Sequence, residues 1–273
     1  MINLVKSELY RLINRKSSWI ILFLSILISI AYTLMFIPGA KYGDEALTNC
    51  VISAINYQST KGPILRNSNA LNNPHAVLSN ISLLLIFIVL PILICSMINE
   101  ERSNGSIRMV LTRSYFKGEV FLSKLIAIIL FNFITITLIF ITSFICGKRM
   151  LPAINYTNIL LQSSKIDPMG SFLFNIKFYC IFFIQMTMMS VIFSIVATFV
   201  KNTVVAIMLN IALLISGCYL SKFLANFIVC PVTYIYDILG GKTSYLIIAI
   251  MLFITAILVI FLKKVWDRLD FVD

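Results

Sequence analysis

The sequence predicts an all-α polytopic membrane protein with six transmembrane helices. Of its 273 residues, 60% are hydrophobic and 12% are charged, and the mean hydropathy is +0.97. Soluble domains contain about 45–50% apolar and about 25% charged residues, so the chain lies far outside their range. Six helices of roughly 20 residues each can cross the bilayer and leave modest loops. No room remains for a large soluble domain, so a pump with its own nucleotide-binding domain is not expected.

Residues 1–16 are predicted to form an amphipathic helix that lies in the membrane interface. Apolar residues recur on one face at helical spacing, namely Ile2, Val5, Leu9, Leu12 and Ile13. Basic residues supply the polar side, namely Lys6, Arg11, Arg15 and Lys16. A helix with this pattern lies along the head groups and does not cross the bilayer.

Six apolar stretches follow, each of a length suited to crossing a bilayer. The predicted spans are 17–37, 78–98, 121–146, 178–200, 204–220 and 245–262. The first span is too long for the apolar core of a signal peptide, and Pro91 is expected to kink the second. A further apolar piece, 223–229, is too short to cross and is interpreted as an interfacial or re-entrant segment between the fifth and sixth spans.

The density of basic residues in the connections predicts the orientation. With six spans both termini share one side, and the short connections on that side hold most of the Lys and Arg residues. Such an excess marks the cytoplasmic side. Both termini are therefore expected in the cytoplasm, with the long connection 38–77 outside, in a multi-pass protein of the cytoplasmic membrane. The net charge of +11 is attributed to these loops and to contact with anionic membrane lipid, and nucleic acid is not an expected partner.

Residues that could support catalysis or bind a metal are few and scattered. The single histidine, His75, follows Pro74 in the predicted outer connection without Glu or Cys at ligand spacing. It is interpreted as a solvated loop residue. The six cysteines lie too far apart for a metal motif and are interpreted as packing residues, while a disulfide between Cys50 and Cys230 stays open. The sequence therefore predicts no catalytic residue and no metal site.

Nucleotide binding, proteolysis and ion coupling also lack the residues they require. The run from Gly240 to Thr243 resembles the end of a phosphate-binding loop, but Tyr236 stands where the first glycine is needed. Glu100-Glu101 lacks the arginine of a glutamate-type intramembrane protease, because Gly105 occupies its place. None of the six predicted spans contains an acidic residue, although ion-driven transporters usually carry one. The chain is thus expected to bind no cofactor and to draw the energy for any transport from elsewhere.

The connection from Glu100 to Lys124 has the most specific pattern in the chain. Ser106 follows Gly105 and can cap a short helix. Apolar residues then recur at helical spacing between basic flanks, and they are Ile107, Val110 and Leu111 with Arg108 and Arg113. A short amphipathic helix just below a membrane is suited to a groove on a soluble partner. An ordinary basic loop bound to lipid head groups accounts for the same residues equally well.

This pattern resembles the ABC type-2 permease family, whose members typically read E-x3-G-[ST]-x-[KR]-x2-L-x-[ST/R]-[PS]. The matching residues are Glu101, Gly105, Ser106, Arg108, Leu111, Arg113 and Ser114, with Lys124 near the start of the next span. The N-terminal helix is similar to that of the family through Glu8, Arg11, Arg15, Lys16 and Trp19. Two places differ from the commonest form of the family. Ser114 fits the pattern but stands where proline is common, and Phe116-Lys117-Gly118 replaces the usual serine–arginine pair.

The resemblance implies a single transmembrane permease domain over residues 1–273, which acts as a transport subunit of an ABC exporter and not as an enzyme. In this family two permeases, as a homodimer or a paired heterodimer, join two ATPase subunits that bind ATP and Mg²⁺. Residues 103–115 would be the coupling helix, with Glu101, Gly105, Ser106, Arg108, Leu111 and Arg113 as its contacts to the ATPase. Members of this size export antimicrobial peptides, antibiotics or other amphipathic compounds. A membrane scaffold or sensor is the alternative, followed by an intramembrane enzyme.

Overall fold

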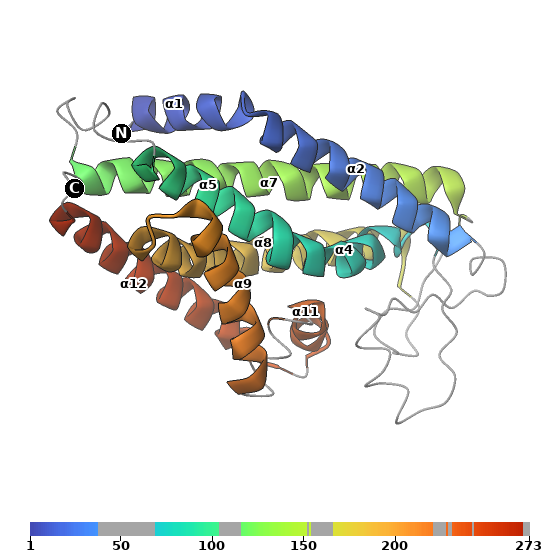
Figure 1. Ribbon diagram of the computed structural model, residues 1–273. Helices are drawn as coiled ribbons and strands as arrows, with labels where there is room; N and C mark the ends of the chain where they lie inside the picture. Colours follow the sequence, from blue (N-terminus) through green and yellow to red (C-terminus); the bar gives the residue numbers. More distant parts are fainter. Residues whose placement is uncertain are drawn as a thin grey trace.

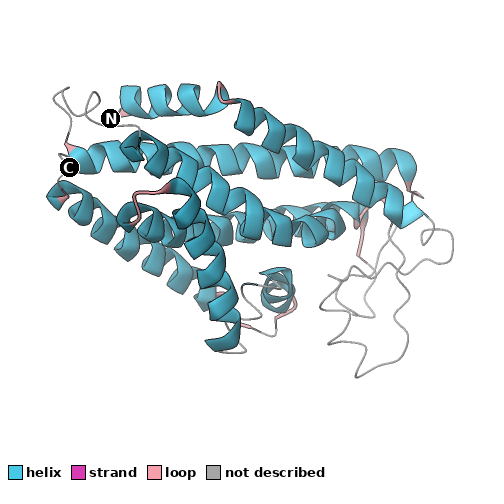
Figure 2. Cartoon of the chain, in the orientation of Figure 1, coloured by secondary structure: helices cyan, strands magenta, loops and turns pink. Residues whose placement is uncertain are grey.

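The computed structural model describes residues 1–37, 69–103, 116–151, 153, 166–220, 228, 231–241 and 243–269, with the side chains of 100–103 and 233 excepted. These residues form helices and no strand (Figure 2). The helices are α1 (Ile2–Ile13), α2 (Lys16–Phe36), α4 (Asn73–Leu84), the π turn η2 (Leu85–Val89), α5 (Leu90–Ser103), α7 (Lys117–Met150), α8 (Pro168–Phe199), α9 (Thr203–Leu220), α11 (Pro231–Leu239) and α12 (Leu246–Arg268). The prediction of an all-α protein is confirmed.

Within the described residues, six helices are long and apolar enough to cross a membrane, as the sequence predicts. They are Lys16–Phe36, Asn73–Asn99, Lys117–Met150, Pro168–Phe199, Thr203–Leu220 and Leu246–Arg268. Some extend beyond their predicted bounds. α7 has 34 residues and is therefore about 51 Å long, well above the roughly 30 Å of the hydrocarbon core. Hydropathy locates only the part of a helix that lies in hydrocarbon, whereas the helix itself continues into the interface.

Both chain termini lie at the same end of the helix bundle (Figure 1). We call this the terminal end, and we call the opposite end, where α2 and α7 finish and α4 and α8 begin, the far end. α7 runs from one end to the other and packs against α1, α2, α4, α8 and α12. The second span, formed by α4, η2 and α5, is the most enclosed of the six. Of its most apolar 18 residues 67% are buried, against 17% in the first and last spans.

The N-terminal helix forms as predicted, but a different face packs against the bundle. Leu4, Glu8 and Leu12 are buried, one at every fourth position, whereas Ile2 is 75% exposed. α1 therefore packs on α7 along a line that contains a carboxylate and that shares only Leu12 with the predicted apolar stripe. The polar contacts of Glu8, described below, explain why a charged residue lies on the buried face.

The second span departs from α-helical geometry just before Pro91. Residues Leu85–Val89 form a π turn, in which the Leu90 N–H donates to the Leu85 carbonyl five residues back. The irregularity expected at Pro91 therefore lies one turn earlier and takes the form of a π turn.

The connection predicted over 38–77 ends earlier than expected, and its histidine is buried. α4 begins at Asn73 with Pro74 in its first turn, a position that proline favours. His75 is 0% exposed, and its ring lies against aromatic rings of α8 and α11. The interpretation of His75 as a solvated loop residue is wrong, because the polar start of α4 is packed into the bundle.

Two predictions fall on residues outside the described ranges. Of the predicted re-entrant segment 223–229 only residue 228 is described, and neither Cys50 nor Cys230 is. Just after this segment, α11 forms a helix that the sequence did not lead us to expect. The described cysteines are free thiols, and they are Cys95, Cys146, Cys180 and Cys218.

Candidate functional site

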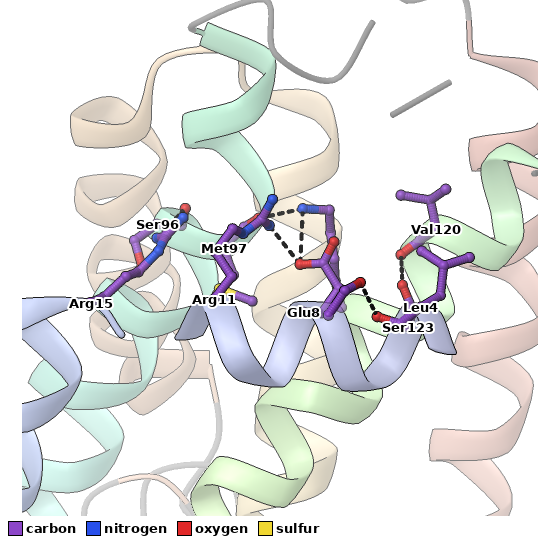
Figure 3. A network of polar contacts seen from close by, with 10 residues as sticks. Leu4, Glu8, Arg11, Arg15, Ser96, Met97, Val120 and Ser123 are labelled. Carbon is purple, nitrogen blue, oxygen red and sulfur yellow. Dashed lines mark hydrogen bonds and ion pairs between the residues drawn. The ribbon is translucent and has the colours of Figure 1, made fainter. Parts of the chain in front are cut away.

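Polar side chains of α1 meet α5 and α7 at the terminal end of the bundle (Figure 3). Glu8 is 3% exposed and Lys124 is 0% exposed. The Glu8 carboxylate lies 3.8 Å from the Lys124 Nζ and accepts a hydrogen bond from the Arg11 guanidinium. Opposite charges this close offset part of the free energy that is lost when both leave water. We call Glu8, Arg11, Arg15 and Lys124 the charged cluster.

The charged cluster also binds the backbone of α5. The Lys124 Nζ donates to the Met97 carbonyl at 3.1 Å, and the Arg15 guanidinium donates to the Ser96 carbonyl at 3.2 Å. Arg15 belongs to the junction between α1 and α2, and Lys124 belongs to α7. The last turns of α5 are therefore fixed to both neighbours by charge-assisted hydrogen bonds, which are stronger than neutral ones.

The start of α7 is held in addition by the end of α12. The Gly118 N–H donates to the Asp267 Oδ1 at 2.8 Å, and a Cβ at Gly118 would lie 2.7 Å from that same oxygen. The Lys117 Nζ donates to the Leu269 carbonyl at 2.7 Å. Glycine at this position therefore permits the close approach of α12 that the hydrogen bond needs.

Two further contacts join the helices of the terminal end. The buried Trp266 of α12 donates its indole N–H to the Thr198 Oγ1 of α8 at 3.0 Å and packs on Phe121 of α7, with ring centroids 5.1 Å apart. Asn99 of α5 donates to the Val200 carbonyl, at the end of α8, at 2.6 Å. α5, α7, α8 and α12 thus form one joint, to which the charged cluster adds α1.

A second polar network joins the helices at the far end. Asn73, at the start of α4, donates to the Thr33 Oγ1 of α2 at 3.1 Å and to the Ser143 carbonyl of α7 at 2.6 Å. A Cβ at Gly147 would lie 2.8 Å from the Asn73 Cβ. The absence of a side chain at Gly147 therefore lets α7 approach α4 closely enough for these hydrogen bonds.

The start of α4 is bound to α8 as well. The Tyr179 hydroxyl donates to the Pro74 carbonyl at 2.8 Å, and the Asn175 Nδ2 donates to the Leu71 carbonyl at 2.9 Å. The His75 Nδ1 lies 2.6 Å from the Asn175 Oδ1. Buried polar groups need such partners, so this network accounts for the burial of several amides and a histidine at the far end.

A comparison with known protein families gives a match over most of the chain. Residues 2–229 match the model of a family described as ABC-2 family transporter protein. The protein belongs to the ABC-2 transporter family. It is therefore a membrane permease subunit of an ABC transporter, and the family implies an ABC ATPase as its partner. No curated protein and no solved structure matches the chain.

Five of the six predicted coupling residues of this ABC-2 permease lie outside the described ranges. They are Gly105, Ser106, Arg108, Leu111 and Arg113. Of Glu101 only the backbone is described, within α5. The predicted coupling helix over 103–115 therefore stays a prediction. The helices on its two sides, α5 and α7, meet at the charged cluster of the terminal end.

Three of the four residues predicted for the interfacial helix of the ABC-2 permease come together. Glu8, Arg11 and Arg15 point toward α5 and α7 (Figure 3), whereas Lys16 begins α2 and is exposed. The sequence predicts Arg11 and Arg15 on the outer polar side of the helix. Arg15 instead donates to the Ser96 carbonyl of α5, and Arg11 donates to the buried Glu8 carboxylate of its own helix. The reason is that a buried carboxylate and two carbonyls of α5 bind the cations of the charged cluster.

Sequence reasoning missed two features of this ABC-2 permease. The first is the pairing of Glu8 with Lys124. Its signal in the sequence is weak: Glu8 stands four residues from both Leu4 and Leu12, so all three share one face of the helix. The far-end network also has a signal, because an Asn followed by Asn-Pro is typical of the start of a helix and not only of a loop.

Proposed function

We propose that this permease exports an amphipathic or lipophilic compound across the cytoplasmic membrane, driven by a separate pair of ATPase subunits that bind ATP and Mg²⁺. The compound would be an antimicrobial peptide, an antibiotic or a lipid-like molecule, and its export would serve resistance or immunity. The observation that carries the proposal is the bond between Lys124 of α7 and the Met97 carbonyl of α5. It ties together the two helices that flank residues 104–115, so a movement of that segment would reach both helices at once.

The acidic residues of the described spans support an external source of energy. Within these spans they are Glu119 and Asp267. Both lie within three residues of a helix end, at the terminal end of the bundle. Ion-driven transporters usually carry an acidic or histidine side chain inside a span, and the histidine of this chain, His75, lies in the first turn of α4. ATP hydrolysis by a partner subunit is therefore the better source of energy.

A groove between α7 and α8 supports a lipophilic cargo. It encloses about 330 Å³, and its lining includes Phe133, Phe140, Tyr179 and Phe183. The Thr137 hydroxyl in its lining donates to a carbonyl of its own helix. The groove lies near the middle of two spanning helices, at the depth of the hydrocarbon core. Such a surface suits hydrocarbon better than a hydrophilic polymer.

The distribution of charge supports a cytoplasmic position for the terminal end. Five exposed lysines lie there, namely Lys6, Lys16, Lys201, Lys263 and Lys264, against Lys148 and Lys177 in the far-end halves of α7 and α8. An excess of Lys and Arg marks the cytoplasmic side. Labelling in intact cells should therefore modify a cysteine placed at Met169, which is exposed near the far end, and spare one placed at Lys201. The reverse pattern would contradict the orientation.

The exposed faces of the spans support a pair of permeases, either identical or different. α2 and α9 are among the least buried of the six spans. They expose large apolar side chains, among them Phe23, Leu27, Met208 and Leu213. Crosslinking in membranes along these two helices should trap permease pairs. A single permease that transports at the full rate with its ATPase would contradict this part of the proposal.

Co-purification with the ATPase, followed by an ATPase assay, tests the proposed function. The Leu111→Asp substitution removes an expected apolar anchor worth about 1.5–3 kcal/mol and puts a charge into the groove of the ATPase. We expect this variant to insert normally and to lose its ATPase, whereas Leu111→Met, matched in size, keeps it. A Leu111→Asp protein that retains both its ATPase and its transport would contradict the coupling role. An unmodified chain without any ATPase would favour a membrane scaffold or sensor.

A further inference from the structure

The second span contains one residue more than a continuous α-helix would need. Residues Leu85–Val89 form a π turn inside a helix that is otherwise α-helical from Asn73 to Ser103. A π turn inserts a single extra residue into an α-helix, and such turns occur frequently at functional sites. Here the turn lies in the most enclosed span of the bundle. A change in its geometry would therefore move a helix that packs against most of the other spans.

Pro91 gives a physical reason for this turn. It has no N–H, and its ring collides with the carbonyl four residues earlier, that of Phe87, when the helix is purely α-helical. A carbonyl without a partner in hydrocarbon costs several kcal/mol. In the π register a carbonyl faces the N–H five residues on, as the Leu90 bond to the Leu85 carbonyl shows. A π turn just before Pro91 takes the span out of the purely α-helical register in which this collision and this missing bond arise.

The two halves of this span are fastened to different parts of the molecule. α4 is tied at the far end to α2 and α7 through Asn73 and to α8 through the Pro74 carbonyl. α5 is tied at the terminal end to α7 through the Met97 carbonyl and to α8 through Asn99. A straight rod fastened at both ends would pass every movement of one end to the other.

The stretch between these ties has no polar side chain of its own. Every residue from Leu83 to Ile94 is apolar, so only van der Waals packing fixes the middle of the span against its neighbours. Ile88, within the π turn, is 52% exposed, whereas Leu85 and Ile86 are buried. The turn therefore has an outward side at Ile88, where a change in its geometry disturbs the core least.

We propose that the π turn Leu85–Val89, together with Pro91, is a hinge at which α5 turns against α4 during the transport cycle. The hinge lets the terminal end follow the ATPase while the far-end network keeps a separate arrangement. This inference rests on the proposed function, because the movement of α5 would come from the coupling segment and its ATPase.

Two variants that differ by one alanine test the hinge. The first carries Ile88→Ala and Pro91→Ala and keeps the number of residues in the π turn. The second carries Pro91→Ala with Ile88 deleted, so the span can wind as a continuous α-helix while α4 and α5 keep their faces. Both lose the same side chains, and alanine favours the helix in both. Any difference between them reports on the extra residue.

Each variant is purified with its ATPase, and three quantities are measured: the melting temperature in detergent, the amount of bound ATPase and the rate of ATP hydrolysis. The deletion variant should match the control in melting temperature and in bound ATPase. Its hydrolysis should be slower by about tenfold or more, since each tenfold corresponds to 1.36 kcal/mol of added barrier. Hydrolysis slows because closure of the ATPases requires the second span to bend, and a continuous α-helix resists bending.

Each other outcome overturns the hinge. Equal hydrolysis in both variants would show that the extra residue has no part in the cycle. A melting temperature that falls together with hydrolysis would show that the residue holds the packing of the span. An unmodified chain that binds no ATPase would remove the proposed function and the hinge together, whereas an intact, active complex with equal hydrolysis in both variants would remove the hinge alone.

Discussion

The two ends of the bundle are held together by different chemistry. At the terminal end, the buried carboxylate of Glu8 lies beside Arg11 and Lys124. At the far end, Asn73 joins α2 and α7 through an amide and its partners, a hydroxyl and a carbonyl. Both joints fasten the same two elements, α7 and the second span. The same helices are therefore held by charged groups at one end and by neutral hydrogen bonds at the other.

This difference indicates which end separates more readily. Removing one partner of a buried ion pair costs about 3–5 kcal/mol, whereas removing one partner of a buried neutral hydrogen bond costs about 1–3 kcal/mol. The stronger joint thus lies beside the predicted coupling segment, where a force from the ATPase would arrive. The weaker joint lies at the opposite end, where an export path would have to open.

The largest expected effect comes from breaking the ion pair of the terminal end. Glu8→Leu leaves Lys124 buried beside Arg11 and Arg15 without a carboxylate, so like charges then face one another. We expect the free energy of unfolding to fall by about 3–5 kcal/mol, measured as a large drop of the melting temperature in detergent.

The double variant Glu8→Leu/Lys124→Leu is the control for this prediction. Replacing both members of a buried ion pair by apolar side chains is often neutral, so the double variant should recover most of the lost stability. The coupling between the two sites follows from the double-mutant cycle. A double variant as unstable as Glu8→Leu would show that the pair does not hold α1 to α7.

A smaller effect is expected from crowding the far end. Gly147→Ala puts a Cβ 2.8 Å from the Asn73 Cβ, an atom next to the backbone that cannot swing away. α4 and α7 must separate, which lengthens the bond from Asn73 to the Ser143 carbonyl. Overpacking of this kind costs about 1–3 kcal/mol, to be measured by thermal unfolding in detergent.

Gly170→Ala is the matched control for the far end. Its added Cβ would lie 2.9 Å from the Ile166 Cγ2, a methyl group that a rotation of the side chain can remove. Both substitutions gain the same helical preference of alanine over glycine, so this gain cancels in the comparison. Equal losses of stability in the two variants would contradict a special role for the contact between Gly147 and Asn73.

The spans could be predicted from the sequence, but the two joints could not. A run of about twenty apolar residues has one main physical explanation, so all six spans follow from hydropathy. The pairing of Glu8 with Lys124 depends on how two helices far apart in the sequence pack. Hydropathy scores Glu8 and Lys124 only as polar residues and does not predict that they meet. His75 was misplaced because Asn-Pro is typical of a turn as well as of a helix start. The π turn could not be predicted from hydropathy, because one extra apolar residue within an apolar run does not change the pattern.

The smallest expected effect concerns one hydroxyl of the far end. Tyr179→Phe removes the donor to the Pro74 carbonyl at 2.8 Å and keeps the ring, which packs on Phe140 with centroids 4.9 Å apart. The hydroxyl also lies 3.5 Å from the Ser143 Oγ, a longer contact that adds little. We therefore expect a loss of about 0.5–1.5 kcal/mol and a slight fall of the melting temperature.

Tyr10→Phe is the control. It removes a tyrosine hydroxyl at a position that is 72% exposed and should leave the melting temperature unchanged. If the Tyr179→Phe variant instead loses as much stability as Glu8→Leu, the far end is the stronger joint and the order of the two ends is reversed. A fall that is small but clearly above that of Tyr10→Phe supports a far end held by several weak bonds. Such an end can open one hydrogen bond at a time while the charged joint keeps α1, α5 and α7 together.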